Sequence, residues 1–229
     1  MLIIGHRGSR GTLPENTVES LLEAIRVGVD ILEFDVRITK DKQPILAHDL
    51  HMIKTHRKLD YYRRHSLANL RQQTKHSKYP ATTLEQALEV SYGQVVVNIE
   101  IKESAAIPAV LDTVKKYVKK AADWDNVLFS SFSPLVLRKL RKAAPKACLA
   151  LLHHRNPLNF LVWYRSLDLT AVGFHRLYLS SFGLSVAKEL GLFTYVYTVN
   201  RPQAAKKLLN RGVDGLVTDY PADMIKSLN

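Results

Sequence analysis

The chain has 229 residues, of which 46% are hydrophobic, and this suits one large globular domain with a sizeable core. Its 33 Lys and Arg residues outnumber its 21 Asp and Glu residues, which gives a formal charge of +12. No apolar run reaches the roughly 18 residues of a transmembrane helix, and the single cysteine, Cys148, excludes an internal disulfide and a cysteine-based metal cluster.

Strand-like and helix-like segments alternate along the chain. The predicted strands are 2–5, 31–38, 95–101, 127–130, 148–152, 171–174, 193–199 and 215–218. The predicted helices are 15–27, 83–90, 107–120, 134–143, 159–166, 184–190, 203–210 and 222–228. Pro134, Pro202 and Pro221 stand where helices would begin, and Gly191 and Gly212 stand where helices would end.

Eight strands alternating with helices, in a chain near the typical ~250 residues, predict an α/β fold of the (β/α)8 TIM-barrel type. We interpret residues 1–229 as a single barrel domain, with a doubly wound open sheet as the structural alternative. Residues 51–80 are polar and poorly periodic. We interpret them as a small insertion after the hairpin of the second strand.

That hairpin carries the first chemical signal. Glu33 and Asp35 alternate along the second strand, so both side chains point to one face. The link 40–42 is too short for a parallel crossover, so the run 43–48 should pair antiparallel, with opposed positions summing to about 82. This register places His48 next to the carboxylates. Two acids and a histidine have no role in building a core, and they predict a metal site with an acid/base partner.

In a (β/α)8 barrel the active site forms at the C-terminal ends of the strands, and polar residues of this chain gather there. Glu33, Asp35 and Glu100 offer an all-oxygen ligand set, which suits the hard cations Mg²⁺ or Ca²⁺ better than zinc. Arg7 and Lys102 add fixed positive charge. Together with the metal they would form a site for a phosphoryl group.

Histidines complete the predicted site. His6 and His48 can exchange protons near neutral pH, so metal-assisted phosphodiester cleavage is the natural chemistry for this set. One histidine would assist the attacking oxygen, and the other would protonate the leaving alcohol. Three further histidines near strand ends, His153, His154 and His175, are expected to be hydrogen-bonded or solvent-facing rather than catalytic.

Other polar residues keep two interpretations each. Glu15 and Asn16 either begin a helix or support the site. Asp219 either orients a group in the barrel mouth or caps a helix. The three acids of the predicted metal site could instead form structural ion pairs, but they outnumber the bases on their face.

A series of short motifs carries a family resemblance, and the motifs follow one another in family order over nearly the whole chain. They are Gly5-His6-Arg7-Gly8, Pro14-Glu15-Asn16-Thr17, Glu33-Phe34-Asp35-Val36, Thr39-Lys40-Asp41, His48-Asp49, Thr83-Leu84-Glu85, Asn98-Ile99-Glu100-Ile101-Lys102, Thr198-Val199-Asn200, Gly212-Val213-Asp214-Gly215 and Thr218-Asp219-Tyr220-Pro221. Each motif is weak alone, but the ordered set closely resembles the glycerophosphodiester phosphodiesterase family.

The resemblance implies a (β/α)8 fold and hydrolysis of small-molecule glycerophosphodiesters to glycerol 3-phosphate and an alcohol. It implies acid/base roles for the two histidines, metal binding by the three acids, and phosphate binding by Arg7 and Lys102. It also implies that the insertion helps to shape the substrate entrance. Tyr197 stands where the family usually has tryptophan, and with Asn200 it is a candidate substrate contact.

Two other functions are alternatives. The basic charge and the aromatic run 160–164 motivate a lysophospholipase D-like hydrolysis of lysophospholipids. The second alternative is a phosphate-ligand binding barrel without chemistry.

The charge itself suits an anionic substrate, an anionic membrane surface or nucleic acid. Its clusters, such as Lys115-Lys116 and Arg141-Lys142, are spread over predicted outer helices, and no nucleic-acid-binding motif accompanies them. We therefore expect no nucleic-acid partner, and membrane contact is an alternative that the sequence does not favour. A histidine and an arginine follow Met1 too early for a signal peptide, so a cytoplasmic location is the default expectation.

Overall fold

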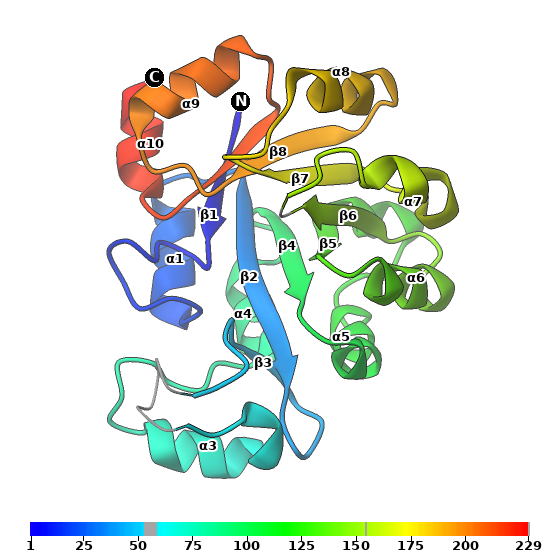
Figure 1. Ribbon diagram of the computed structural model, residues 1–229. Coiled ribbons are helices and arrows are strands. Elements are labelled where there is room, and N and C mark those ends of the chain that lie inside the picture. The colour runs from blue at the N-terminus through cyan, green and yellow to red at the C-terminus, as the bar shows by residue number, and fades with distance from the viewer. Residues whose placement is uncertain (53–58, 154, 229) are drawn as a thin grey trace.

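A closed barrel of parallel strands forms the centre of the molecule (Figure 1). The computed structural model describes residues 1–52, 59–153 and 155–228. The barrel strands within these ranges are β1 (Leu2–His6), β2 (Ile31–Ile38), β4 (Val96–Ile101), β5 (Val127–Ser131), β6 (Cys148–His153), β7 (Ala171–His175), β8 (Phe193–Tyr197) and β9 (Gly215–Thr218). Pairing of β1 with both β2 and β9 closes the ring. The predicted (β/α)8 barrel is confirmed, and the open sheet is excluded.

A ring of helices surrounds the barrel (Figure 1). Its helices are α1 (Val18–Arg26), α4 (Leu84–Ser91), α5 (Ile107–Val114), α6 (Pro134–Ala143), α7 (Phe160–Leu167), α8 (Ser181–Glu189), α9 (Pro202–Asn210) and α10 (Pro221–Leu228). Short 3₁₀ turns, η2 (Ser104–Ala106) and η3 (Ala121–Asn126), flank α5 and β5. The prolines at the starts of α6, α9 and α10 are where the sequence predicts them. No helix in the described part of the chain combines the length and the apolar character that a membrane span needs.

Two helices are shorter than their periodicity predicts. α1 begins at Val18 because Thr17 is its N-cap, and the Thr17 side chain accepts a backbone hydrogen bond from the first turn. α5 ends at Val114, where the predicted helix would continue to residue 120. The N–H groups of Lys116 and Tyr117 bond to carbonyls three residues back, so the chain tightens into turns there.

The strand β3 (Pro44–Leu46) lies outside the ring and pairs antiparallel with the second half of β2. Every opposed pair sums to 82, as the hairpin prediction requires: Val36 with Leu46, Arg37 with Ile45, and Ile38 with Pro44. Lys42 adopts a φ of +61°, so the turn reaches the left-handed conformation without glycine. The first half of β2 pairs with β1 in the barrel, whereas its second half extends past β1 and pairs with β3. The segment that follows β3 therefore returns to the barrel mouth.

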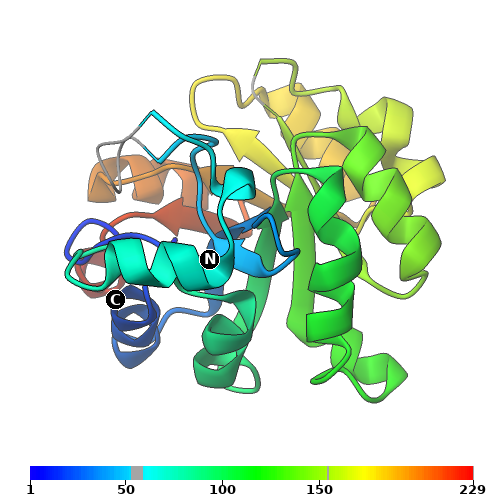
Figure 2. The same cartoon turned by 90° about the horizontal axis from the view of Figure 1, so that it is seen from below.

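The insertion contains η1 (Tyr62–Arg64) and a helix, α3 (Leu67–Thr74), that the sequence analysis did not predict. In Figure 1, α3 stands apart from the ring of helices, and in Figure 2, seen from below, it lies in front of the barrel. Its periodicity is weak and Ser66 caps its start, so the hydrophobic pattern gives little signal. The insertion packs on the hairpin through a small core of its own, which consists of Ile45, Ala47, Met52, Tyr62 and Leu70. Its residues 53–58 lie outside the described residues.

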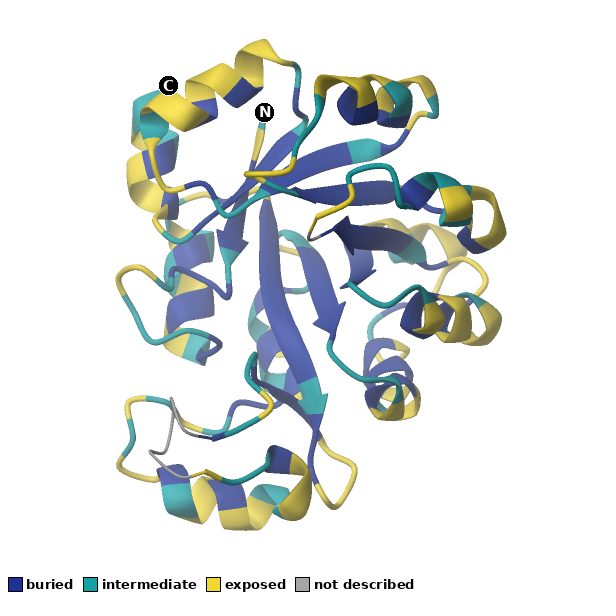
Figure 3. Ribbon diagram, in the orientation of Figure 1, coloured by how far each residue is buried: buried dark blue, intermediate teal, exposed yellow. Residues whose placement is uncertain are grey.

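The main core lies between the strands and the helices, and a second cluster fills the barrel interior. Figure 3 shows this as buried strands surrounded by helices whose outer faces are exposed. The interior cluster consists of Ile4, Ile31, Leu128, Ala150, Leu152, Ala171, Tyr195 and Val217. At the C-terminal ends of the strands the interior becomes polar, and that end carries the candidate site.

Candidate active site

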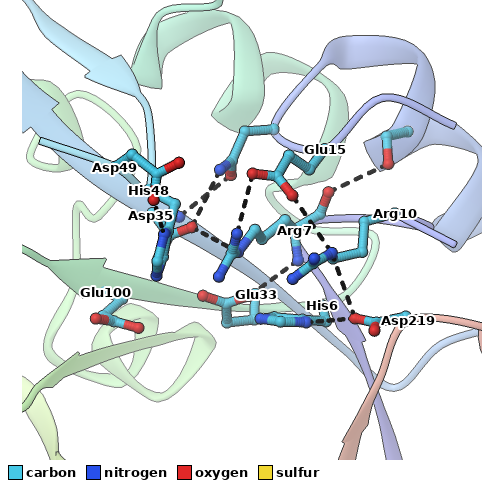
Figure 4. Close-up of polar contacts among 12 residues, drawn as sticks. His6, Arg7, Arg10, Glu15, Glu33, Asp35, His48, Asp49, Glu100 and Asp219 are labelled. Carbon is cyan, nitrogen blue, oxygen red and sulfur yellow. Dashed lines mark hydrogen bonds and ion pairs between the residues drawn. The ribbon is translucent and has the colours of Figure 1, made fainter. Parts of the chain in front are cut away.

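Strand register brings the three predicted acids together. His6 of β1 lies opposite Glu33 of β2, and Asp35 of β2 lies opposite Glu100 of β4. One oxygen each from Glu33, Asp35 and Glu100 lies within 4.8 Å of the other two, and all three residues are buried. Figure 4 shows the acids with His6 and His48 close by. The strand ends therefore form an all-oxygen cluster, as the alternation in β2 and β4 predicts.

The pKa values of the three acids are shifted in different directions. Burial, reinforced by the charges of Asp35 and Glu100, raises the pKa of Glu33 well above its ordinary value. Burial and the Asp35 charge raise the pKa of Glu100 to about 7. Burial also opposes ionisation of Asp35, but Lys102 and Arg7 outweigh it and hold the Asp35 pKa well below its usual range. Three carboxylates thus lie beside only two cationic side chains, those of Arg7 and Lys102. The carboxylate oxygens therefore suit one further cation, such as a divalent metal ion.

Asp35 is held from several sides. Arg7 Nε lies 2.9 Å from Asp35 Oδ2, and Lys102 Nζ lies 2.8 Å from Asp35 Oδ1. Asn16 Nδ2 donates to Asp35 Oδ2 at 3.1 Å, while Asn16 Oδ1 accepts from the Asp35 N–H at 3.3 Å. Lys102 also donates to Glu100. Asn16 therefore supports the site, because the cap of α1 is the next residue, Thr17.

Arg7 connects the loop after β1 to the acids. Its φ of +52° turns its backbone N–H toward Glu33 Oε2, to which it donates at 2.9 Å. Its Nη1 donates to Glu15 Oε1 at 3.0 Å, and Arg10 Nε lies 3.3 Å from the other Glu15 oxygen. Glu15 thus orients two arginines, and the N-cap of α1 is Thr17. Arg7 and Lys102, the predicted phosphate ligands, are both held against Asp35.

His6 lies at the end of a chain of polar side chains. Its Nδ1 lies 2.5 Å from Asp219 Oδ1. A carboxylate can only accept, so Nδ1 carries the proton and Nε2 is unprotonated in the neutral ring. Asn200 Nδ2 donates to Asp219 Oδ2 at 2.7 Å, and Asn200 Oδ1 accepts from the Asp219 N–H at 2.9 Å.

These contacts decide between the two interpretations of Asp219, because it orients His6. Burial opposes ionisation of Asp219, but His6, Asn200 and Arg10 together outweigh it and lower the Asp219 pKa to about 2. Burial and the charge of Arg7 lower the pKa of His6, although Asp219 opposes the shift. The Asn200 amide bonds to Asp219, a role that the sequence analysis missed. His6 and Asp219 are 213 residues apart, so no local pattern could reveal their contact.

His48 follows β3 and is the more exposed of the two histidines, at 37% of its side chain against 13% for His6. Its Nδ1 lies 2.7 Å from Asp49 Oδ1, which leaves Nε2 as the proton acceptor of the neutral ring. Its carbonyl accepts from Arg37 Nε at 3.0 Å and from Arg37 Nη2 at 2.8 Å. Burial lowers the pKa of His48, although Asp35 opposes the shift. Both histidines are therefore neutral bases near pH 7.

Tyr197 forms an aromatic wall beside the acids. Its hydroxyl donates to the His153 carbonyl, and its ring contacts Phe132 and His175 edge-on, at 5.9 and 5.7 Å between ring centres. It lines a cavity of about 40 Å³ together with His6, Glu33, Asn98, Glu100, Ser130, Phe132, Leu152, Tyr195 and Val217. His153 is buried beside Phe160 and Phe174, and its Nε2 has no hydrogen-bond partner among the described residues, so the predicted hydrogen-bonded or solvent-facing state is wrong for this nitrogen. His154 lies outside the described residues.

Comparison with known proteins relates this site to a family of hydrolases. The family model described as "Glycerophosphoryl diester phosphodiesterase family" matches residues 6–223. The chain is 28% identical over 235 residues to a glycerophosphodiester phosphodiesterase of Caldanaerobacter subterraneus subsp. tengcongensis, covering 98% of this chain and 96% of that protein. It is 30% identical over 244 residues to a glycerophosphodiester phosphodiesterase of Bacillus altitudinis, with 98% and 96% covered.

A solved structure agrees with these relatives. It is that of an Oleispira antarctica phosphodiesterase in complex with the product sn-glycerol-3-phosphate. It matches this fold with a TM-score of 0.90 and 26% identity, covering 100% of this chain and 96% of that one.

Proposed function

Because the chain belongs to the glycerophosphoryl diester phosphodiesterase family, we propose that it hydrolyses glycerophosphodiesters to glycerol 3-phosphate and an alcohol. One observation carries the proposal: two histidines, each oriented by a carboxylate, flank a cluster of three buried acids and two cationic side chains, Arg7 and Lys102. The Oleispira antarctica phosphodiesterase was solved in complex with its product sn-glycerol-3-phosphate, and the proposed reaction releases glycerol 3-phosphate as well.

The acid cluster supports a divalent-cation site. Glu33, Asp35 and Glu100 would hold Mg²⁺ or Ca²⁺, because carboxylate oxygens suit hard cations and these three lie close enough to share one. The raised pKa values of Glu33 and Glu100 mark an excess of negative charge that a cation would relieve. When bound, such a cation polarises the phosphoryl group and offsets the charge that develops on it.

The histidines support proton transfer in both directions. His6 and His48 each present an unprotonated Nε2, because Asp219 and Asp49 fix the proton on Nδ1. One Nε2 would take the proton of the attacking oxygen, and the other ring, once protonated, would give its proton to the leaving alcohol. Either water or a hydroxyl of the glycerol group can act as the nucleophile in this arrangement.

Arg7 and Lys102 would bind the phosphoryl oxygens. Arg7 is buried and Lys102 is half-buried at the acid cluster, and both carry a raised pKa because nearby carboxylates outweigh the effect of burial. They remain charged over the whole working range, so they favour a dianionic transition state over a neutral ligand. Tyr197 would then wall the side of the cavity that receives part of the substrate.

The test is an activity panel on the purified full-length chain. Glycerophosphocholine, glycerophosphoethanolamine and lysophosphatidylcholine are each combined with Mg²⁺, with Ca²⁺ and with EDTA, and glycerol 3-phosphate is measured with a coupled dehydrogenase. We expect cation-dependent release from the two water-soluble diesters. Binding of these diesters without release under any cation would instead support a binding barrel without chemistry.

A further inference from the structure

Exposed apolar side chains gather at the mouth of the barrel. Of the large hydrophobic residues exposed in the described part of the chain, Leu2, Leu22 and Leu209 lie away from the mouth. The others follow strand ends, lie in the first turn of the next helix, or belong to the insertion and its entrance: Leu50, Leu59, Leu135, Val162, Leu177, Tyr178, Phe182 and Tyr220. Because all C-terminal strand ends meet at the mouth, these side chains form an apolar rim around it.

The rim is densest between β7 and α8. Leu177 is 72% exposed, Phe182 is 66% exposed, and Tyr178 lies between them in sequence. Exposure of side chains of this size to water is unfavourable, and clustering them on one exposed face does not stabilise a monomer. In the aromatic run 160–164 only Phe160 is fully buried, while Val162 is 73% exposed and belongs to the rim, and the other three residues are partly buried against the main core.

A basic groove lies directly beside this part of the rim. It has a volume of about 380 Å³, and its cationic residues are Arg176, Arg201, Lys207 and Arg211. Arg211 Nη2 donates to Ser181 Oγ at 3.2 Å, which joins α9 to the start of α8, and the two lie side by side in Figure 1. No carboxylate of the described residues forms an ion pair with these four cations.

One end of the groove adjoins the active site. Asn200 lines the groove and donates to Asp219, which in turn holds His6. Leu177 lines the groove as well, so the cations and the apolar rim form one continuous surface. We call this surface, defined by Arg176, Leu177, Phe182, Arg201 and Arg211, the docking face.

We propose that the docking face binds the surface of an anionic lipid bilayer and turns the barrel mouth toward it. Four unpaired cations require an anionic partner, and exposed Leu and Phe side chains require an apolar one. A bilayer rich in anionic lipids supplies both at one interface, since cations contact the head groups while the apolar side chains enter the acyl boundary. Nucleic acid would satisfy the cations and leave the apolar rim in water.

The proposal is tested by vesicle co-sedimentation without any turnover. Full-length protein is mixed with vesicles of phosphatidylcholine alone or of phosphatidylcholine with phosphatidylglycerol, at low and high salt. We expect sedimentation with the anionic vesicles that weakens as salt rises. Two double variants separate the two contributions to binding: Arg176→Gln with Arg201→Gln, and Leu177→Ser with Phe182→Ser.

Matched controls remove the same groups elsewhere. Lys115→Gln with Lys119→Gln removes two exposed cations near the far end of α5, and Leu22→Ser removes an exposed leucine on α1. Each cation near an anionic surface contributes about 1 kcal/mol, so the arginine double variant should lower vesicle partitioning about 30-fold. The Leu177 and Phe182 double variant should lower it about 10-fold or more, and each control should lower it less than about threefold.

Other results overturn the proposal. Absence of wild-type binding to anionic vesicles does so, as does equal loss of binding in the lysine control and the arginine variant. Tighter binding to duplex DNA, lost in the arginine variant and kept in the Leu177 and Phe182 variant, would make nucleic acid the partner. Release of glycerol 3-phosphate from glycerophosphocholine should stay unchanged in both docking-face variants, so failure of docking and failure of the proposed reaction are distinguishable.

Discussion

The contact between Asp219 and His6 allows a sharp test of how proton transfer is arranged. Asp219→Asn keeps the shape of the side chain and exchanges one acceptor oxygen for a donor NH₂ group. In the native site both Asp219 oxygens accept, one from His6 Nδ1 and the other from Asn200 Nδ2. The substituted amide can satisfy one of these donors but must oppose the other.

The hydrogen bonds of Asn200 indicate whether Asn200 or His6 adjusts to the new amide group. Asn200 Oδ1 accepts from the backbone N–H of residue 219 at 2.9 Å and from Thr218 Oγ1 at 3.3 Å. Reversing the Asn200 amide would lose both hydrogen bonds, at a cost of about 1–3 kcal/mol. His6 should therefore move its proton to Nε2, which removes the base that faces the mouth.

We expect Asp219→Asn to lower kcat by ~10²–10⁴, or about 3–5 kcal/mol of activation free energy, with little change in KM. Steady-state release of glycerol 3-phosphate measures this effect. Asp223→Asn, the same exchange at an exposed acid on α10, is the matched control and should behave as wild type. In a His6→Ala background the Asp219 substitution should cost little more, because it acts through that ring.

Two outcomes would refute the reasoning. One is a kcat for Asp219→Asn within about threefold of wild type, while His6→Ala is inactive. The other is a full multiplicative loss in the double variant, which would mean that Asp219 acts independently of His6.

Three further predictions concern the cation, its pH dependence and the core. EDTA should abolish turnover, and Mg²⁺ or Ca²⁺ should restore it; activity that survives complete chelation would contradict the cation site. Cation affinity should rise with pH up to about 7 and release protons, because the raised pKa of Glu100 leaves it protonated below that pH; calorimetry in buffers of different ionisation enthalpy measures this, and a pH-independent affinity would argue against it. Phe129→Ala should lower the free energy of unfolding by about 3–5 kcal/mol in urea titrations, because Phe129 is fully buried in β5; a loss below about 1 kcal/mol would contradict its place in the core.

The sequence predicted the barrel well because its strands are short apolar runs bounded by clear helix signals. All eight predicted barrel strands are present, with bounds that differ by two residues at most. The hairpin register is confirmed as well, since turn length fixes the pairing of two adjacent strands. The helix α3 was missed because its burial depends on contacts such as Leu70 with the hairpin, and its own periodicity is weak.

The sequence likewise predicted one part of the candidate site and left another part undetermined. Alternation within β2 and β4 was enough to predict that Glu33, Asp35 and Glu100 converge. The partners that orient the site come from distant loops, such as Asn16 on Asp35 and Asp219 on His6. Contacts of this kind depend on how the barrel closes, so local patterns leave them undetermined. The catalytic, metal-binding and phosphate-binding roles remain predictions, as do the single-domain interpretation and the substrate contacts of Tyr197 and Asn200.

The identity of the phosphate ester bond that the enzyme breaks tests the proposed reaction. ³¹P NMR of glycerophosphocholine, incubated with the purified chain and Mg²⁺ or Ca²⁺, separates the two sets of products. The account predicts that the diester signal is replaced by that of glycerol 3-phosphate, and that His48→Ala slows this ~10²–10⁴-fold while the protein stays folded. Phosphocholine as the product, or near wild-type turnover by His48→Ala, would contradict it.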